Sequence, residues 1–261
     1  MTRLAAPSPA AAAAASASGA ATPPAAAAAS AAARSHAAAR THAPAEPPAA
    51  VRVHPTALVE AGVEIGPGSS IWDHAHLRGP AHLGAECIVG GKSYIAYGVV
   101  IGNRVKINSF VYLCTGVTVE DGVMISAGVV FTNDRFPRAA TPDLARLRPS
   151  QPDEHTLPTL VREGATIGAR AVVGCGLEIG RFAMVGMGAV VTRSVPDFHL
   201  ALGSPARSVG CVCRCGQPLA RFAPGGAPPP GPAVCAACGR WYELGPGALV
   251  TETRRGATRS A

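Results

Sequence analysis

The chain has 261 residues, of which 48% are hydrophobic, 15% charged and 5% aromatic, and its formal net charge is +7. This length allows one or two domains with a sizeable core, and few aromatic residues beside 30 Gly argue against a helical bundle. The positive charge lies at the ends, because residues 1–50 carry +2 and residues 206–261 carry +5. The segment between them is neutral, which argues against a nucleic-acid partner.

Residues 1–50 form a low-complexity segment with 26 Ala and 7 Pro. Such a composition offers too little varied apolar surface to offset the entropy of ordering, so we expect a disordered tail. Its longest Ala-rich stretch is interrupted by Ser and by Pro23-Pro24 and holds no Leu, Ile or Phe, which argues against a membrane span. The first acidic residue of the segment is Glu46, so a transit peptide is the alternative to a plain tail. Nothing in the sequence signals export, and we expect a cytoplasmic protein.

From residue 59 onward, aliphatic residues recur at every sixth position, and none of the eighteen slots is polar. The slots hold Ile65, Ile71, Leu77, Leu83, Val89, Ile95, Ile101, Ile107, Leu113, Val119, Ile125 and Phe131, then Val161, Ile167, Val173, Ile179, Val185 and Val191. A second series, two residues earlier, holds small or β-branched residues such as Ser69, Cys87 and Val105.

A period of six fits neither a helix of 3.6 residues per turn nor a simple alternating strand. It fits a solenoid in which each six-residue unit supplies one short strand and one turn. Three units close a triangular coil of about 18 residues whose interior takes the aliphatic series. The sequence therefore predicts an all-β fold, a parallel β-helix of about six coils over residues 51–207.

Residues 132–160 interrupt the repeat and contain five Pro. Loops longer than about 12–15 residues are uncommon unless they are functional or disordered. A loop that leaves a rigid solenoid is a natural place for a binding or catalytic site, so we expect the site there.

Four segments resemble the left-handed β-helix acyltransferases, and among them the nucleotide-aminosugar N-acetyltransferases. They are Ile71-Trp72-Asp73-His74-Ala75-His76-Leu77-Arg78, the loop Val130-Phe131-Thr132-Asn133-Asp134-Arg135-Phe136-Pro137-Arg138, the re-entry segment 159–168 and the exit segment 186–207. The resemblance covers roughly residues 54–245. It implies a left-handed coil, a homotrimer, and acetyl-CoA bound in the groove between neighbouring subunits, with a nucleotide-linked aminosugar near the loop.

The same resemblance implies roles for individual residues. The loop asparagine of the family falls on Asn133, which would hold the sugar amine beside the thioester; Asp134 and Asn108 complete the expected catalytic set, although Asn108 is equally well explained as structural. The expected substrate contacts are Trp72, His76, Arg78, Arg135 and Arg138, the arginines because guanidinium groups suit phosphates. The expected CoA contacts are Gly186, Gly188, Ala189, Gly203, Pro205 and Arg207.

The histidine inventory bears on the mechanism. No His lies between His82 and His155, so the central coils offer no imidazole base. From the residues alone, a base must come from elsewhere or be dispensable. The family resemblance implies direct attack of the amine on the thioester, with the departing sulfur taking the proton. Catalysis would then come mainly from positioning, aided by N–H donors to the developing oxyanion.

The eight cysteines fall into two groups. Cys87, Cys114 and Cys175 are expected to be small core residues. Cys213-x-Cys215 and Cys235-x-x-Cys238, separated by nineteen residues, have a spacing compatible with a structural zinc ribbon over residues 208–245. Cys211 is either spare or an alternative ligand, and residues 246–261 are expected to be a tail.

Other functions are open on the same fold. A trimeric zinc carbonic anhydrase would need three converging His, which the central coils do not offer. A non-catalytic scaffold is disfavoured by the intact loop motif, and transfer to a hydroxyl would favour the His base that is absent.

Overall fold

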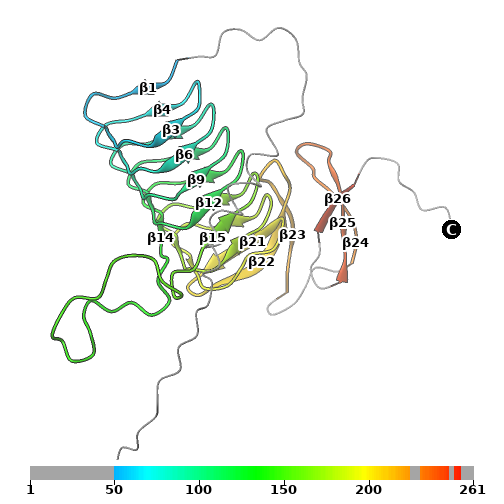
Figure 1. Cartoon of the computed structure of the whole chain (residues 1–261). Coiled ribbons are helices and arrows are strands. Elements are labelled where there is room, and N and C mark those ends of the chain that lie inside the picture. The colour runs from blue at the N-terminus through cyan, green and yellow to red at the C-terminus, as the bar shows by residue number, and fades with distance from the viewer. Residues whose placement is uncertain (1–49, 224–229, 247–249, 254–261) are drawn as a thin grey trace, which may run out of the picture.

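The computed structural model describes residues 50–223, 230–246 and 250–253, and its strands stack into a long solenoid with a smaller module beyond it (Figure 1). Residues 1–49 of the expected N-terminal tail, and 247–249 and 254–261 of the expected C-terminal tail, lie outside the described residues. No helix within the described part of the chain is long and apolar enough to cross a membrane.

Three parallel sheets form the faces of the solenoid, and a fourth sheet belongs to the module. Sheet A contains β1 (Arg52–Val53), β4 (Ser70–Ile71), β7 (Ile88–Val89), β10 (Lys106–Ile107), β13 (Met124–Ile125), β16 (Thr166–Ile167), β19 (Met184–Val185), β21 (His199–Gly203), β22 (Ala206–Val212) and β23 (Pro218–Arg221). Sheet B contains β2 (Leu58–Val59), β5 (His76–Leu77), β8 (Tyr94–Ile95), β11 (Tyr112–Leu113), β14 (Val130–Phe131), β17 (Val172–Val173) and β20 (Val190–Val191). Sheet C contains β3 (Val63–Ile65), β6 (Ala81–Leu83), β9 (Val100–Ile101), β12 (Val117–Val119), β15 (Thr159–Val161) and β18 (Glu178–Ile179). The fourth sheet contains β24 (Gly231–Val234), β25 (Trp241–Leu244) and β26 (Val250–Thr253).

Each of the first six coils supplies one strand to each of the three sheets, and the last coil supplies strands to sheets A and B. Residues eighteen apart are in register, as Leu58 is with His76 and Ile107 is with Ile125. This arrangement confirms the predicted left-handed parallel β-helix. Sheet B has seven strands, one for each coil, against the predicted six or so, because the coiling already begins at Arg52, ahead of the first apolar slot.

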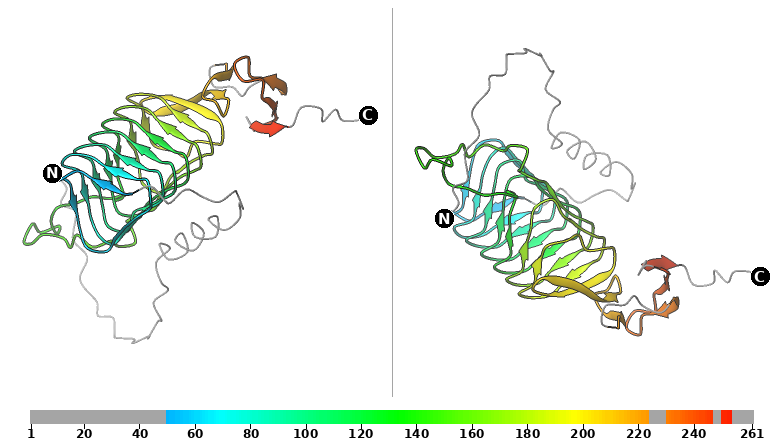
Figure 2. Two further views of the ribbon diagram at one scale, coloured as in Figure 1. Left: turned by 90° about the horizontal axis from the view of Figure 1, so that it is seen from above. Right: turned by 90° about the horizontal axis from the view of Figure 1, so that it is seen from below.

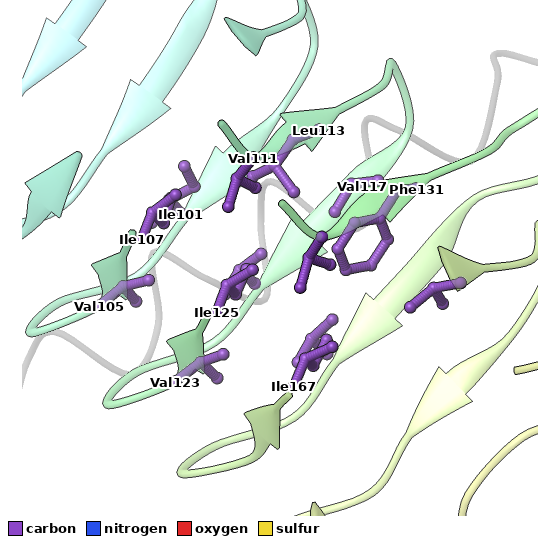
Figure 3. Packing of buried hydrophobic residues seen from close by; sticks show 14 of the residues in the cluster. Ile101, Val105, Ile107, Val111, Leu113, Val117, Val123, Ile125, Phe131 and Ile167 are labelled. Carbon is purple, nitrogen blue, oxygen red and sulfur yellow. The ribbon is translucent and has the colours of Figure 1, made fainter. Parts of the chain in front are cut away.

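The six-spaced aliphatic residues fill the interior of the coils, as predicted (Figure 3). Ile107, Ile125 and Ile167 lie above one another in successive coils, and each is 0% exposed. Phe131, in the slot just before the loop, is also fully buried. At roughly 1.5–3 kcal/mol for each buried aliphatic side chain, this stack is the main source of stability.

The second series faces the interior beside the first, and its polar members are hydrogen-bonded. The Ser69 hydroxyl donates to the Gly84 carbonyl at 2.9 Å and accepts from the Cys87 amide at 2.9 Å, so its burial costs little. Cys87 and Cys114 are buried, as predicted. The prediction for Cys175 is wrong: it is only half-buried, because it lies in a turn between two sheets.

The turns form three columns, which we name by the sheets they join: the A–B, B–C and C–A corners. Successive turns of one column lie in contact, which explains the glycines that follow the aliphatic slots. A Cβ on Gly84 would lie 2.5 Å from the Gly102 carbonyl oxygen, and one on Gly90 would lie 2.5 Å from the Asn108 backbone, so no larger residue fits.

The loop leaves the solenoid at the B–C corner, between β14 and β15. It spans residues 132–158, and so ends earlier than the predicted 160, because Thr159 and Leu160 already pair with Val117 and Thr118 in sheet C. The re-entry therefore restores the solenoid register at once.

The C-terminal module lies beyond the last coil (Figure 2). β21 and β22 form an antiparallel hairpin that extends sheet A, so this sheet continues past residue 207 into the segment expected to be the zinc ribbon. β26 falls within the expected tail from residue 246, but it pairs with β25 and buries Val250, so the module extends to Thr253. The module has its own core, which includes Phe198, Tyr242 and Leu244.

Candidate functional site

The loop between β14 and β15 folds back on itself and has a closed base. The Leu157 amide donates to the Asn133 carbonyl at 2.8 Å, and the Arg135 amide donates to the His155 carbonyl at 3.1 Å. Farther out, the Arg148 amide donates to the Ala139 carbonyl at 3.0 Å. These bonds hold both arms of the loop together, so residues 133–138 face residues 148–156.

Asn133 lies half-buried at the foot of this loop. Its Nδ2 donates to the Thr115 carbonyl, one coil below, at 3.2 Å, while its Oδ1 makes no hydrogen bond with any described residue. The side chain therefore has a fixed orientation and a free acceptor oxygen. Asp134 is exposed, and its Oδ1 accepts a hydrogen bond from the Phe136 amide at 2.8 Å, the geometry of an Asx turn.

A pocket of about 120 Å³ lies between the two arms of the loop and the solenoid. Its lining includes Tyr97, Asn133, Asp134, Arg138, Arg148 and Thr156. Three of these are sequence-predicted site residues, namely Asn133, Asp134 and Arg138. The predicted Arg135 lies outside the lining, with its guanidinium 5.6 Å from the centre of the Phe136 ring.

Tyr97 and Arg148 are pocket residues that the sequence analysis missed. Tyr97 occupies the same position in its turn as Asn133, two coils below, so the eighteen-residue register would have found it. Arg148 is half-buried and pairs with Asp153 at 3.3 Å, whereas Arg146 in the same arm is exposed. Nothing in the sequence distinguishes these two arginines, because the loop interrupts the register.

His76 and Arg78 belong to a polar cluster below the pocket. Glu60 Oε1 lies 2.7 Å from His76 Nε2 and 3.4 Å from Arg78 Nε. The hydrogen bond from His76 lowers the pKa of Glu60. The Arg78 guanidinium lies 5.4 Å from the Tyr97 ring centre and donates to the Tyr94 hydroxyl at 3.4 Å. Both predicted residues are therefore linked to the pocket wall through Tyr97.

The remaining predicted catalytic and substrate residues lie at the opposite edge of sheet B. Trp72, 53% exposed, and Asn108, half-buried, are both at the A–B corner. The Asn108 carbonyl accepts a hydrogen bond from the Ser93 hydroxyl at 3.0 Å. Within one chain, Asn108 thus does not join Asn133 in a single cluster.

The predicted CoA residues fall into two places. Gly186, Gly188 and Ala189 are at the A–B corner of the last coil, where the Ala189 side chain is 0% exposed and faces the core. Gly203, Pro205 and Arg207 belong to the β21–β22 hairpin, and Arg207 Nη1 donates to the Ala206 carbonyl at 2.8 Å. Any contact of Ala189 with a ligand would therefore be through its backbone.

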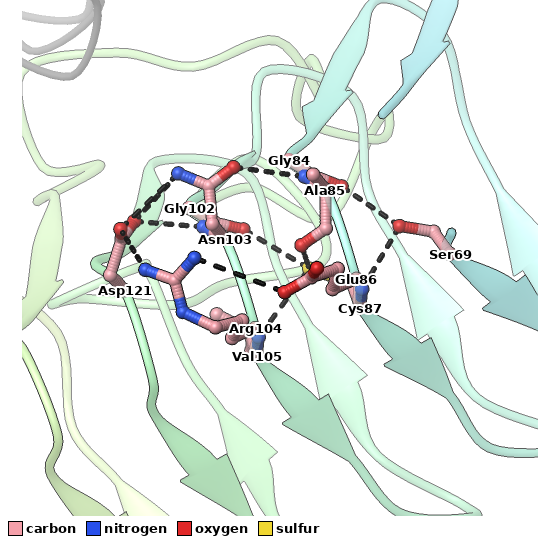
Figure 4. A network of polar contacts seen from close by, with 10 residues as sticks. All are labelled: Ser69, Gly84, Ala85, Glu86, Cys87, Gly102, Asn103, Arg104, Val105 and Asp121. Carbon is pink, nitrogen blue, oxygen red and sulfur yellow. Dashed lines mark hydrogen bonds and ion pairs between the residues drawn. The ribbon is translucent and has the colours of Figure 1, made fainter. Parts of the chain in front are cut away.

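The C–A corner carries a different polar column, away from the loop (Figure 4). Asn103 accepts from the Ala85 amide at 2.9 Å, and Asp121 accepts from the Asn103 amide at 2.8 Å. Arg104 Nη2 lies 3.2 Å from Asp121. Each side chain satisfies the turn of a neighbouring coil, so this column stabilises the corner.

Four cysteines of the module converge. The sulfur atoms of Cys213, Cys215, Cys235 and Cys238 all lie within 4.8 Å of one another, with Cys213–Cys238 at 3.4 Å and Cys215–Cys235 at 3.6 Å. A tetrahedral zinc site with Zn–S bonds of about 2.3 Å has sulfurs about 3.8 Å apart, so the geometry fits. Cys211 is not a member of the group: it is 0% exposed in the module core, and burial raises the pKa of its thiol.

The fold is a left-handed β-helix of hexapeptide repeats with one long loop at a corner. The repeats match two family models, the bacterial transferase hexapeptide (six repeats) over residues 98–133 and the hexapeptide repeat of succinyl-transferase over residues 80–114 and 158–193. The chain thus contains hexapeptide repeats of the kind that these two transferase models describe, over residues 80–133 and 158–193.

The chain is also similar to individual proteins. It is 54% identical over 61 residues to the dTDP-3-amino-3,6-dideoxy-α-D-galactopyranose 3-N-acetyltransferase of Aneurinibacillus thermoaerophilus, which covers 23% of this chain and 32% of that protein. It is 28% identical over 131 residues to the galactoside O-acetyltransferase of Lactococcus lactis, which covers 48% of this chain and 60% of that protein. The chain thus spans less than two thirds of the length of either relative.

Among solved structures, the chain is similar to a variant of the N-acyltransferase AntD from Bacillus cereus in complex with dTDP and coenzyme A. The identity is 22% and the TM-score 0.40, over 58% of this chain and 85% of that chain.

Proposed function

We propose that this protein is an acyl-CoA-dependent N-acetyltransferase that acts on the amino group of a nucleotide-linked aminosugar. The matches to the hexapeptide-repeat models of transferases support acyl transfer. The segment 54% identical to a 3-N-acetyltransferase of a dTDP-linked aminosugar supports the substrate class. The residues of the loop pocket supply the chemistry that such a substrate needs.

The placement of Asn133 carries the proposal. Asn133 lines the pocket, and because its Nδ2 is held by the Thr115 carbonyl, its Oδ1 is left to accept an N–H of the substrate amine. This bond orients the nitrogen lone pair toward the thioester carbon. The C–N bond forms as the C–S bond breaks, and the proton of the attacking amine passes to the CoA thiolate.

The proton balance needs no histidine in this scheme. The His nearest to the pocket in sequence is His155, whose ring packs against Phe136 with centroids 5.3 Å apart and lies outside the pocket lining. An amine with a pKa near neutrality is partly unprotonated and already nucleophilic. A hydroxyl acceptor would instead need a base in contact with its proton.

Transfer to a hydroxyl is the second candidate, because the chain also resembles a galactoside O-acetyltransferase over 131 residues. Asp134 is the carboxylate of the pocket closest in sequence to Asn133, but its Oδ1 already accepts the Phe136 amide. The amine therefore remains the preferred acceptor.

We propose that the active unit is a homotrimer with acetyl-CoA bound between subunits. Exposed apolar side chains gather on sheet B and the A–B corner, among them Leu58, Trp72, Phe110, Tyr112 and Met187. A subunit interface would bury this surface. It would also bring the A–B corner of one subunit, with Asn108, Gly186 and Gly188, toward the loop pocket of its neighbour.

Arg138 and Arg148 are suited to the diphosphate of the substrate, since they border the pocket from opposite arms of the loop. Tyr97 offers an aromatic face beside them. Gly203, Pro205 and Arg207 would contact CoA farther along the groove, with Arg207 at a phosphate.

We further propose that the four cysteines bind one structural zinc ion. Four thiolates leave no open position, so the ion would stabilise the module and take no part in acyl transfer. Metal analysis of purified protein should find about one zinc per chain. Fully folded protein that neither contains nor takes up zinc would refute this site.

The reaction is tested by measuring thiol release from acetyl-CoA with a matched pair of acceptors. One is a dTDP-linked 6-deoxyhexose with an amino group at C3, and the other carries a hydroxyl at the same carbon. We expect release with the amino sugar alone. Release with the hydroxyl sugar alone would establish the O-transfer alternative. No release with either acceptor or with UDP-linked 3-amino sugars would favour a scaffold.

A further inference from the structure

The residue between the first two cysteines of the cluster contacts the β-helix. The backbone N–H of Arg214 donates to the Tyr242 hydroxyl at 2.9 Å, and the same hydroxyl lies 3.1 Å from Cys213 Sγ. Tyr242 is 1% exposed in the module core. The backbone of Arg214 is thus fixed by a cysteine on each side and by a buried tyrosine.

The side chain of Arg214 extends from this fixed backbone to the solenoid. Its guanidinium lies 4.4 Å from the centre of the Phe182 ring and 3.5 Å from the Glu163 carboxylate. It also lies 3.6 Å from Glu252 in β26. Glu163 and Phe182 are in consecutive turns of the C–A corner, after β15 and β18, so one guanidinium joins two coils to the module.

An aromatic chain runs beside this contact. Tyr242 packs edge-on against Phe198 with ring centroids 5.6 Å apart, and Phe198 stacks on Phe182 at 5.5 Å. The Phe182 ring in turn covers Gly164, where a Cβ would lie 2.1 Å from the ring. The contacts therefore continue without a gap from the cysteine cluster to the turn after β15.

We propose that the four-cysteine cluster, when it holds zinc, acts through Arg214 as a metal-dependent clamp on the C–A corner of the last coils. Terminal coils of a solenoid lack a neighbour on one side and are its least stable part. The clamp supplies contacts that a further coil would otherwise provide. This inference rests on the proposed zinc site and is independent of the proposed acyl transfer.

Amide hydrogen exchange on the full chain tests the clamp. The amides of Phe182 and Phe198 donate to the carbonyls of Glu163 and Arg181 at 2.9 and 2.8 Å and report on the clamped corner. The amides of Arg104 and Gly122 make equivalent bonds of 2.8 Å in the central coils and serve as internal controls. Exchange is compared before and after zinc removal by a chelator, in the presence of a reductant.

We expect zinc removal to speed exchange at Phe182 and Phe198 by about tenfold or more and to leave Arg104 and Gly122 unchanged. Unchanged exchange at all four amides, in protein shown to have lost zinc, would overturn the clamp and leave the zinc site standing. An equal increase at all four would also overturn it, because the metal would then stabilise the whole fold. Protein that binds no zinc would refute the zinc proposal itself.

Two substitutions separate Arg214 from the metal. Arg214→Gln and Glu163→Gln should retain zinc and still speed exchange at Phe182, because each removes the link to the solenoid but no ligand. Arg240→Gln is the matched control. Arg240 pairs with the same Glu252 at 2.7 Å, but it contacts no described residue of the solenoid. If Arg214→Gln exchanges like Arg240→Gln, the link does not run through Arg214.

Discussion

The β-helix and the C-terminal module are stabilised in opposite ways. In the β-helix, equivalent side chains from successive coils stack into one continuous core. Many contacts along this core therefore contribute to stability. The module has a separate core of a few residues, three of them cysteines, and its sheet has three short strands. Small units of this kind usually need a metal or a disulfide to remain folded. Repetition thus distributes stability, whereas the module concentrates it in one cluster.

The largest expected effect comes from shortening one buried side chain in each of the two cores. Ile125→Ala removes a fully buried side chain that stacks on Ile107 and Ile167, and it should lower the free energy of unfolding of the solenoid by about 2–5 kcal/mol. Leu244→Ala, in the module core, should leave the main unfolding transition in place and loosen only the module. Urea unfolding followed by circular dichroism measures the first, and protease sensitivity of the module measures the second. Equal losses in the main transition would mean that the two regions unfold as one.

The second prediction concerns the loop, which is the other departure from the repeat. Arg148→Gln should raise the KM for the nucleotide sugar by about tenfold with little change in kcat, because a charge-assisted contact to the diphosphate is lost. Arg146→Gln is the matched control, since Arg146 is exposed and outside the pocket lining. Steady-state kinetics with both variants decides the matter; equal KM values for the two would remove Arg148 from the substrate site.

The smallest expected effect is the pH dependence of stability that comes from Cys114 in the solenoid core. Burial raises the pKa of the Cys114 thiol from 9.0 to about 12. The folded state therefore favours the protonated thiol, and its contribution is complete below pH 9 and is lost as the pH rises toward 12. The slope should be at most about 1.4 kcal/mol per pH unit. Urea unfolding of Cys114→Ala should show a weaker decline in this window than the parent protein; an identical decline would assign the pH dependence to other groups.

The fold was predictable because each coil repeats the same constraint. Inward-facing aliphatic residues at every sixth position form a periodic pattern that identifies the fold. A single residue such as Ile125 or Leu113 would not identify it. The first coil was left out of the predicted count of about six because Val53 and Leu58 are exposed and carry no full slot pattern. Cys175 was misjudged for a related reason, since its place in a turn depends on the register and not on its type.

The candidate site was predictable only where the register reaches it. Positions eighteen apart share a corner, so the numbering contains the places of Thr115 and Tyr97 below Asn133 and the separation of Asn108 from Asn133. The sequence analysis nevertheless missed Tyr97 and grouped Asn108 with Asn133. The pairing of residues 133–138 with 148–156 depends on hydrogen bonds inside a loop without a repeat. For this reason Arg148 could not be told from Arg146, and the reach of Arg214 to Glu163 could not be foreseen.

Two asparagines of equal size test directly whether Asn133 promotes transfer by positioning the amine. Asn133 lines the pocket and its Oδ1 bonds to no described residue, whereas both ends of the Asn103 side-chain amide are bonded within the C–A corner. Turnover and urea unfolding are measured for Asn133→Ala and Asn103→Ala with the amino sugar as acceptor. We predict that Asn133→Ala loses turnover by roughly 100-fold with stability little changed, and that Asn103→Ala loses stability but keeps its turnover. Unchanged turnover in Asn133→Ala would contradict the account.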